Sequence, residues 1–325
     1  MEIIQLSRLH NAQVSGPRPF ISVALPTYRR PDMLRRAVDS ILDQDFSDWE
    51  LVISDDEGPE GASWALLSEY AKNPRIRVVV NRRGRGQVEN SNSAMLACTG
   101  NWIKLLHDDD WLAQGSLEKF AQVARAHPSA AFLTCASNVV EEGRIRYRRG
   151  DRVAVYSSQQ CLTDLYLVGA TRALGIVPST LLINSNVIQA GCLMRTYKSI
   201  AWGVDQLFFV DLARHGDMVT IDDGLIFYDA TNHPCVTANG TFQQIDQETI
   251  DLKRLTWNFV EDKKSVPGPE TVVRALRVAR LRGRFHHQSW GATIRDAMQI
   301  LRPSVMKAAN QAIQVRMLAA RRASA

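Results

Sequence analysis

Short apolar runs alternate with amphipathic stretches through the first third of the chain. Each apolar run ends in polar or turn-forming residues, as buried strands do, and the stretches between them repeat apolar side chains at helical spacing. Strands that are apolar throughout and separated by helices indicate a parallel sheet covered on both faces. The predicted strands are 20–25, 51–53, 76–80 and 102–106, and the predicted helices are 31–43, 63–72 and 87–98.

The rest of the chain is mixed and then becomes helical. Residues 141–156 resemble a hairpin with a charged tip, and the chain before residue 20 reads as a loose lead-in. After Gly240 only helical patterns follow, at about 246–262, 269–282, 290–301 and 304–322. Between these regions we expect helices at 116–127 and 204–215, and strands at 131–136, 178–183, 219–221 and 225–228.

Polar residues gather where the predicted parallel strands end. Thr27 follows the first strand, Asp55 and Asp56 follow the second, and the Gly- and Arg-rich loop 82–86 follows the third. The fourth strand leads into the acidic turn 107–111. Ligands of parallel α/β sheets bind beyond the carboxyl ends of the strands. These segments, distant in sequence, are therefore expected to meet at one edge.

The acidic turn, His107-Asp108-Asp109-Asp110-Trp111, contains three adjacent carboxylates that repel one another. A hard divalent cation such as Mg²⁺ or Mn²⁺ would explain them, because such ions take oxygen ligands and bridge carboxylates to phosphates. The alternative is a solvated acidic turn. Because the neighbouring strand ends converge on this turn, we favour a cation-binding site over a solvated turn.

Composition and charge narrow the class of protein. The chain has 325 residues, 45% apolar, with a net charge of +5. Residues 271–325 carry a charge of +10 and the remainder about −5, so an acidic body precedes a basic tail. No apolar stretch is long enough to span a membrane, and the first twenty residues lack a signal-peptide pattern. Five widely spaced cysteines without a CxxC pair favour reduced thiols, and we expect a cytoplasmic protein.

Several of these motifs, taken in order, resemble glycosyltransferase family 2. They are Pro26-Thr27-Tyr28-Arg29-Arg30, Asp55-Asp56, Gly100-Asn101-Trp102-Ile103 leading into the acidic turn, and Trp202-Gly203-Val204-Asp205. The resemblance covers roughly residues 20–235. It implies an inverting enzyme with an α/β GT-A fold, a Rossmann-like and mostly parallel sheet flanked by helices, followed by a C-terminal helical appendage. The ligands it implies are a nucleotide-sugar donor, with UDP as the expected nucleotide, and Mn²⁺ or Mg²⁺.

The resemblance also divides the chain by role. It implies a lead-in (1–19), a catalytic domain (20–240) and a basic helical region (241–325). Within the catalytic domain, 20–110 is the nucleotide-binding half and 111–240 the acceptor half. The position of Thr27 implies contact with the nucleotide base, and Asp55 or Asp56 would accept the base imide N–H; a helix cap or Asx turn is the alternative for this acidic pair. The full set implied for the nucleotide sugar is Pro26, Thr27, Tyr28, Arg29, Asp55, Asp56, Arg83, Asn92 and Asp108.

The metal ligands follow from the same alignment. Matching on Gly100 puts His107, Asp108 and Asp109 at the family's D-x-D, so the first position is histidine here. We expect Asp109 to bind the metal and Asp108 to reach the ribose or sugar. Asp110 either contacts the metal or supports the loop. His233, in a C-terminal His-Pro, would bind the metal or a phosphate oxygen, although most lone histidines do neither.

The expected general base is Asp205, which matches the acidic residue that the family has at the start of a helix near the acceptor. Removal of the acceptor proton by a base is typically worth about 10²–10⁴-fold in rate. The helix N-terminus is expected to lower the pKa of Asp205 and to favour its carboxylate form. A plain N-terminal helix acid is the alternative. Asp211, on the same helix, is a weaker candidate.

The basic tail is compatible with more than one binding partner. Its arginines are interleaved with apolar residues, so amphipathic helices could lie on an anionic cytoplasmic membrane surface near a lipid-linked or glycan acceptor. Packing on the catalytic body or on a second subunit, as a homodimer, is the competing hypothesis. Arg274, Arg277, Arg280, Arg282 and Arg284 begin this tail.

The sequence disfavours three rival functions. A non-catalytic nucleotide-sugar-binding or scaffold protein is disfavoured because Asp109 and Asp205 are both present. No nucleic-acid partner is expected, because the body is acidic and no RNA- or DNA-binding motif occurs. A dinucleotide-dependent oxidoreductase is disfavoured because Gly84 and Gly86 have no third glycine at Glu89.

Overall fold

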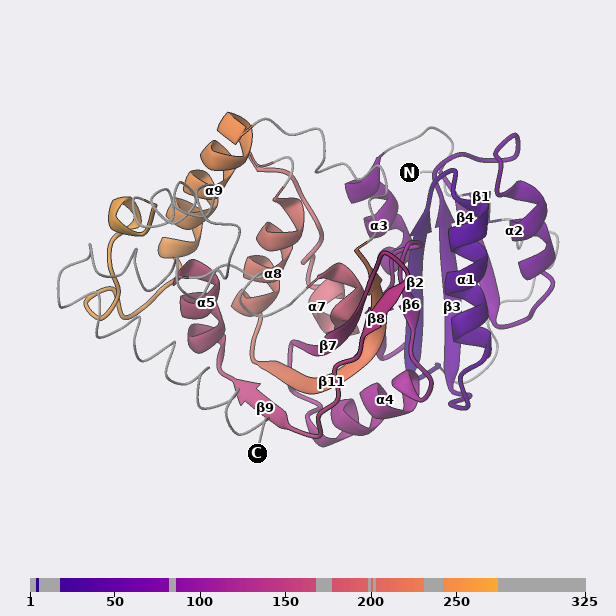
Figure 1. Cartoon of the computed structure of the whole chain (residues 1–325), viewed down its shortest axis with the longest axis horizontal. Helices are drawn as coiled ribbons and strands as arrows, with labels where there is room; N and C mark the ends of the chain where they lie inside the picture. Colours follow the sequence, from indigo (N-terminus) through magenta and orange to yellow (C-terminus); the bar gives the residue numbers. More distant parts are fainter. Residues whose placement is uncertain are drawn as a thin grey trace.

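The chain is built on a large mixed sheet with helices on both faces, as seen in a computed structural model (Figure 1). The structure describes residues 4–5, 18–81, 86–167, 177–197, 200, 203–230 and 242–273. Within these residues eleven strands join in one sheet, whose main path runs β1-β4-β3-β2-β5-β10-β7-β11-β6.

The four strands predicted in the first third form the parallel part of the sheet. They are β2 (Ile21–Thr27), β3 (Trp49–Asp55), β4 (Ile76–Val80) and β5 (Trp102–Leu105), and these four run parallel to one another. Every residue of β2, β3 and β5 is buried, as expected of strands covered on both faces. Their carboxyl ends therefore share one edge.

The second half of the sheet is mixed. β10 (Leu181–Asn184) runs antiparallel between β5 and β7 (Phe132–Glu141), and β7 is parallel to β11 (Met218–Asp229). The two strands expected at 219–221 and 225–228 are one, because shifts in register near Gly224 let β11 continue through the interruption. The short strands that complete the sheet are β1 (Ile4–Gln5), β6 (Trp111–Leu112), β8 (Arg144–Arg146) and β9 (Val153–Tyr156).

The sheet divides the apolar core into two parts, one on each of its faces, and helices cover both parts. The core beneath α1 (Pro31–Leu42), α2 (Trp64–Tyr70) and α4 (Ser116–Ala126) includes Leu34, Leu67 and Phe120. The other face is covered by α3, α5, α7 and α8, with α9 beside α5 and α8 (Figure 1). Their bounds are Gln87–Leu96, Ser158–Leu167, Ser185–Gln189, Val204–Arg214 and Phe242–Trp257, and a 3₁₀ turn spans Pro178–Thr180.

Further elements differ from the sequence expectation. The hairpin expected at 141–156 does not form as one, because β8 pairs with β7 and β9 pairs with β11. Ile4–Gln5, assigned to a loose lead-in, pairs antiparallel with β4 at the sheet edge. Helix α5 was missed, since its pattern Ser-Gln-Gln-Cys-Leu-Thr-Asp-Leu has only a weak apolar stripe. Of the expected C-terminal appendage, the structure describes 242–273; the basic tail from residue 274 lies outside the described residues.

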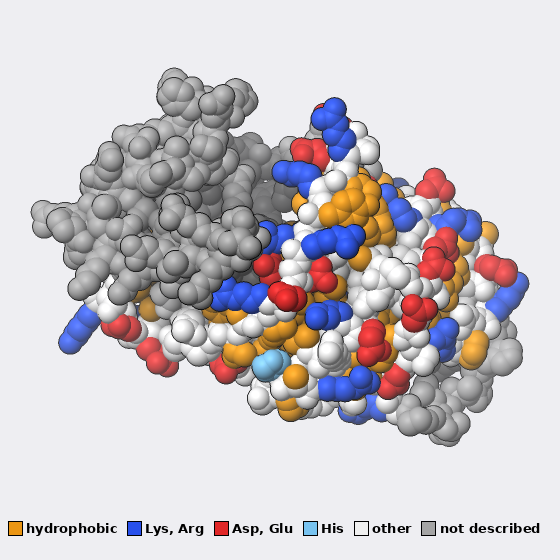
Figure 2. Space-filling view, turned by 60° about the horizontal axis from the view of Figure 1, so that its bottom comes forward, with side chains coloured by type: hydrophobic (Ala, Val, Ile, Leu, Met, Phe, Trp, Pro, Cys, Tyr) orange, Lys and Arg blue, Asp and Glu red, His pale blue; other side chains and the backbone are white. Residues whose placement is uncertain are grey.

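The described surface gives little sign of a single dominant charge. In Figure 2, Lys and Arg side chains are interspersed with Asp and Glu over the described part of that face. Among the described residues, no helix combines the length and apolar character that crossing a bilayer requires.

A buried polar cluster fixes the amino end of the sheet. The Glu50 carboxylate accepts from Ser22 Oγ (2.5 Å), from Thr99 N (2.7 Å) and from Arg77 Nη2 (2.8 Å). Gly100 N donates to the same Ser22 hydroxyl, and a Cβ on Gly100 would collide with the Ser22 backbone nitrogen. Burial opposes ionisation of Glu50, but the Ser22 hydrogen bond, the Arg77 charge and Thr99 outweigh it and lower its pKa.

Replacing Glu50 by Gln should lower the free energy of unfolding by about 2–4 kcal/mol at neutral pH, because Arg77 would lose its buried partner. A folded-state pKa below the ordinary value makes this contribution complete above about pH 4.5 and lost as the pH falls through the lowered value. Denaturant titrations of both proteins should therefore converge in acid. Glu69→Gln, which removes an exposed pair with Lys72, is the control and should have little effect. Equal stability of wild type and Glu50→Gln at neutral pH would contradict the account.

Candidate functional site

Hydrogen bonds of Ser179 and Lys104 hold the acidic turn in place. It follows the end of β5, and His107 N donates to Ser179 Oγ at 3.0 Å. Lys104, fully buried in β5, donates from Nζ to the carbonyls of Leu105 (2.9 Å) and Ser179. Burial of its ammonium group lowers the pKa of Lys104 to about 8. Ser179 thereby ties the second half of the sheet to the turn.

Asp108 and Asp109 share one cationic partner. Arg30 Nη1 lies 3.3 Å from Asp108 Oδ1 and 3.2 Å from Asp109 Oδ2. Thr27 Oγ1 donates to the other Asp108 oxygen at 2.8 Å. Burial raises the pKa of Asp108 and the Asp109 charge adds to this, against Arg30 and Thr27. The end of β2 and the acidic turn thus form one polar surface.

Asp110 has a different set of contacts. Its Oδ1 accepts from the backbone N–H of Asp229, at 3.2 Å, and its carboxyl also bonds with the Ser179 side chain. Burial, with the Asp109 charge adding, raises the pKa of Asp110 to about 7. Of the two roles left open for Asp110, this arrangement favours support of the loop.

The two acids after β3 separate into different roles. Asp55 accepts from the backbone N–H groups of Glu57 (3.3 Å) and Gly58 (2.7 Å), and so closes its own turn. Burial raises its pKa despite these bonds. Asp56 instead accepts from Asn81 Nδ2 at 2.9 Å and Gly86 N at 2.8 Å. Because it links the ends of β3 and β4 to the start of α3, Asp56 is the better candidate for the nucleotide base.

Asp205 lies in the first turn of α8, beside the acidic turn. Its Oδ1 is buried and has no hydrogen-bond partner in the described part of the chain, and the same holds for His107 Nε2. Burial raises the pKa of Asp205, while the charge of His107 opposes the rise and that of Asp109 adds to it. The expectation of a lowered pKa at this helix end is therefore wrong, because loss of solvent outweighs the helix dipole.

The remaining predicted residues are spread around the same edge. Pro26 is the penultimate residue of β2, and Tyr28 beyond it is 47% exposed. Arg29 adopts a left-handed backbone conformation, with φ of 56°, and pairs with Glu57 at 2.8 Å. Arg83 and His233 lie outside the described residues.

Asn92 is already occupied by the protein's own backbone. Its Nδ2 donates to Met194 O at 2.8 Å and its Oδ1 accepts from Met194 N at 2.9 Å. This buried pair joins α3 to the segment after α7. The contacts explain the residue without a ligand, and its binding role stays a prediction.

Sequence reasoning missed four side chains that shape the site. Arg30 stands in the quoted motif but was given no role. Arg36, one and a half turns later in α1, donates from Nη2 to Asp109 O (2.8 Å) and to Asp229 Oδ2 (3.1 Å). Asp229 ends β11, so the strand-end rule that identified Asp55 would have found it. Ser179 carried no comparable signal.

The acidic turn suits a hard divalent cation. Among the described residues, no group of three or more His, Cys, Asp or Glu side chains is arranged to hold a metal ion. Mg²⁺ in phosphate-binding sites, however, needs only one or two carboxylates beside water and phosphate oxygens. Asp108 and Asp109 offer such a pair, and Arg30 between them shows that this point accommodates positive charge.

Comparison with known proteins agrees with this geometry. Residues 22–178 match the model of the family described as Glycosyl transferase family 2. These residues belong to that family. The matched segment runs from β2 to the 3₁₀ turn, and so includes both Thr27 and the acidic turn.

Two similar proteins illustrate the range of relatives. The chain is 30% identical over 128 residues to the GalNAc(5)-diNAcBac-PP-undecaprenol beta-1,3-glucosyltransferase of Campylobacter jejuni, covering 39% of this chain and 41% of that protein. It is 29% identical over 143 residues to the chondroitin synthase of Escherichia coli, covering 44% and 21%. The chain thus spans less than half the length of these curated relatives.

Solved structures support the fold. The crystal structure of S. aureus TarS 1–349 in complex with UDP-GlcNAc aligns with a TM-score of 0.61 and 15% identity, covering 90% of this chain and 80% of that one. The complex of the same protein with UDP aligns with a TM-score of 0.59 and 14% identity, covering 81% and 72%. At this identity the likeness concerns the fold alone, and the expected GT-A architecture is confirmed.

Asn92→Ala should lower the free energy of unfolding by about 2–3 kcal/mol, because two buried backbone groups of Met194 would lose their partner. Denaturant unfolding measures this, with Asn101→Ala, at an exposed asparagine, as the control. Nucleotide affinity should stay unchanged where the variant is folded. Unaltered stability with weakened nucleotide binding would instead make Asn92 a ligand contact.

Proposed function

We propose that this protein is an inverting glycosyltransferase that moves a sugar from a nucleotide-sugar donor to an acceptor hydroxyl during glycan or polysaccharide assembly. The observation that carries the proposal is the buried Asp205 oxygen beside His107 and Asp109, which has no hydrogen-bond partner among the residues that the structure describes. A buried acceptor atom without a donor calls for an explanation. An incoming hydroxyl group supplies one.

The chemistry uses Asp205 as the general base. The acceptor oxygen forms a bond to the anomeric carbon while the bond from that carbon to the diphosphate oxygen breaks. The hydroxyl proton passes to Asp205, and the nucleoside diphosphate leaves with the electron pair. Burial raises the pKa of Asp205 and so makes its carboxylate a stronger base than an exposed aspartate.

The donor's diphosphate would lie against the acidic turn. Asp109 and Asp108 are the residues that would hold Mn²⁺ or Mg²⁺ there, and the ion would neutralise charge on the departing diphosphate. Arg30 already contacts both carboxylates and would lie next to the phosphates. Thr27 and Asp56 line the edge where the nucleotide base would bind.

UDP is the nucleotide we favour, because the fold matches a protein crystallised with UDP and UDP-GlcNAc. A lipid-linked glycan is a plausible acceptor class, since one similar protein is named as acting on an undecaprenol-linked sugar. We further propose a cytoplasmic enzyme. Its basic tail would contact the membrane face, pack on the body or form a homodimer.

Asp109→Ala should abolish metal-dependent donor binding, because it removes the expected ligand. A thermal-shift titration with UDP-sugars, with and without Mn²⁺, measures this. Asp32→Ala, at an exposed acid in the first turn of α1, is the matched control and should behave like wild type. An unaltered Mn²⁺-dependent shift in Asp109→Ala would rule out this residue as the ligand.

Asp205→Asn should keep donor binding and lose about 10²–10⁴-fold in kcat, because the amide cannot take the acceptor proton. The measurement is sugar transfer at saturating donor, beside donor binding by thermal shift. Asp32→Asn serves as the control. Turnover close to wild type would place the base elsewhere.

A further inference from the structure

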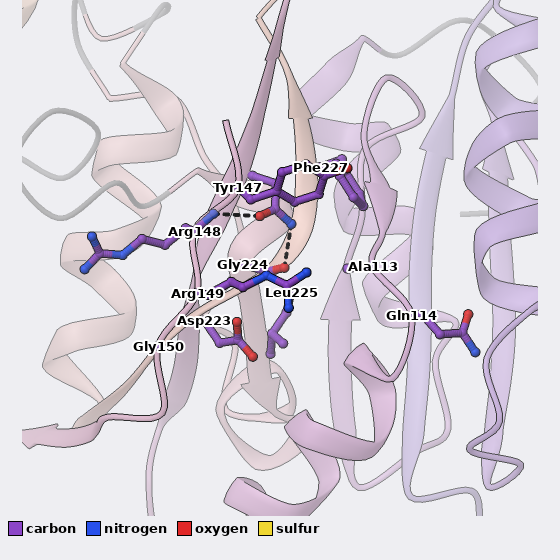
Figure 3. A pocket seen from close by; sticks show the side chains of 11 residues that line it. Ala113, Gln114, Tyr147, Arg148, Arg149, Gly150, Asp223, Gly224, Leu225 and Phe227 are labelled. Carbon is purple, nitrogen blue, oxygen red and sulfur yellow. Dashed lines mark hydrogen bonds between the residues drawn. The ribbon is translucent and has the colours of Figure 1, made fainter. Parts of the chain in front are cut away.

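A cavity of about 430 Å³ lies apart from the acidic turn, on the outer part of the sheet (Figure 3). It is bounded by the loop after β6, by the segment 147–150 that crosses between β8 and β9, and by β11 from Asp223 to Phe227. None of the residues assigned above to donor or metal lines it.

The floor of the cavity is built to a close fit. Asn138, 3% exposed, donates to Gly224 O at 2.6 Å and accepts from Arg148 N at 2.8 Å. A Cβ on Gly224 would collide with Asn138, and one on Gly150 would collide with Asp222 O. Neither glycine can carry a side chain without displacing these neighbours, so the backbone at the floor of the cavity depends on both.

One wall is aromatic and held rigidly. The Phe227 ring stacks on Trp111, with centroids 5.1 Å apart, and Arg36 lies 3.9 Å from the Trp111 centroid. Tyr147 stands nearly perpendicular to Phe227, at 83°, and is 60% exposed. An aromatic side chain fixed in place yet open to solvent offers a ready contact surface for a ligand.

The polar groups around this wall are balanced in charge. The Arg148 side chain extends away from the cavity (Figure 3). It pairs with Asp222 at 2.8 Å. Arg149 and Asp223 line the cavity, and neither has a hydrogen bond or ion pair within the described residues. One free cation and one free anion beside an aromatic ring suit an uncharged ligand rich in hydroxyl groups.

We propose that this cavity binds an uncharged pyranose segment of the acceptor glycan, some distance from the hydroxyl that reacts. Sugar rings stack their C–H faces on aromatic rings, while their hydroxyl groups bond to planar charged groups such as those of Arg149 and Asp223. The inference rests on the proposed glycosyltransferase function and adds a second, remote point of contact to it.

The route from the cavity to the acidic turn follows β11. Alternate residues of a strand share a face, so Phe227 and Asp229, both beyond the shift in register near Gly224, lie on the same face of β11. Asp229 bonds to Arg36, and Arg36 bonds to Asp109 O. At about 3.3 Å per residue, Phe227 at the cavity and Asp229 are roughly 7 Å apart, so the cavity and the acidic turn together span more than a single sugar.

The test is saturation-transfer NMR on the full chain with maltohexaose, laminarihexaose and chitohexaose, and with a chondroitin hexasaccharide as the anionic comparison. At least one neutral probe should bind, and excess UDP should not displace it. Tyr147→Ala and Arg149→Ala should each weaken binding about tenfold. Tyr147→Phe, which keeps the ring, and Arg144→Ala, at an exposed arginine of β8, should bind like wild type.

Each outcome separates this inference from the proposed function. Absence of saturable binding by every neutral probe at millimolar concentration, or binding insensitive to Tyr147→Ala, overturns it. Preference for the anionic probe, lost in Arg149→Ala alone, also overturns it in favour of an anion site. Donor binding measured by thermal shift in the same samples is independent. Its loss with glycan binding intact would count against the transferase proposal only.

Discussion

Mutual repulsion among three consecutive carboxylates is the constraint around which this edge of the sheet is organised. Each acid of the turn after β5 meets it differently. Asp108 has Thr27 and Arg30, Asp109 shares Arg30, and Asp110 is buried against Ser179 and a backbone N–H of β11. Because these partners come from both halves of the sheet, formation of the turn requires the halves to be assembled together.

Burial of charged groups is the second influence on this edge of the sheet. It shifts the pKa of Asp205 in the direction opposite to the one that the helix dipole predicts. A helix N-terminus favours the charged form of an acid, yet the pKa of Asp205 is raised because its carboxylate is desolvated beside another acid. The same desolvation lowers the pKa of Lys104 beneath the turn. Charged groups with few compensating partners gather on this side of the molecule, as is common at functional sites.

The parallel half of the fold was predictable from the sequence, because a buried strand leaves a continuous apolar run and the helices between repeat at their own period. Thr27, Asp56 and Asp109 were predictable for the same reason, since strand ends mark the ligand edge. Arg36 and Ser179 were not, because their roles depend on tertiary contacts that no local pattern records. Helix α5 was not predictable because its apolar pattern is weak. The continuity of β11 was not predictable because its pattern is interrupted at Gly224.

The left-handed backbone conformation of Arg29 limits which residues can replace it. A left-handed backbone at a residue with a Cβ costs about 1–2 kcal/mol relative to ordinary conformations, a penalty that glycine avoids and asparagine reduces. The chain tolerates it directly after Pro26, Thr27 and Tyr28, where the backbone must bend sharply away from β2. The bend at Arg29 therefore costs conformational free energy. A substitution at this position is tolerated only when the new residue can adopt the same backbone conformation.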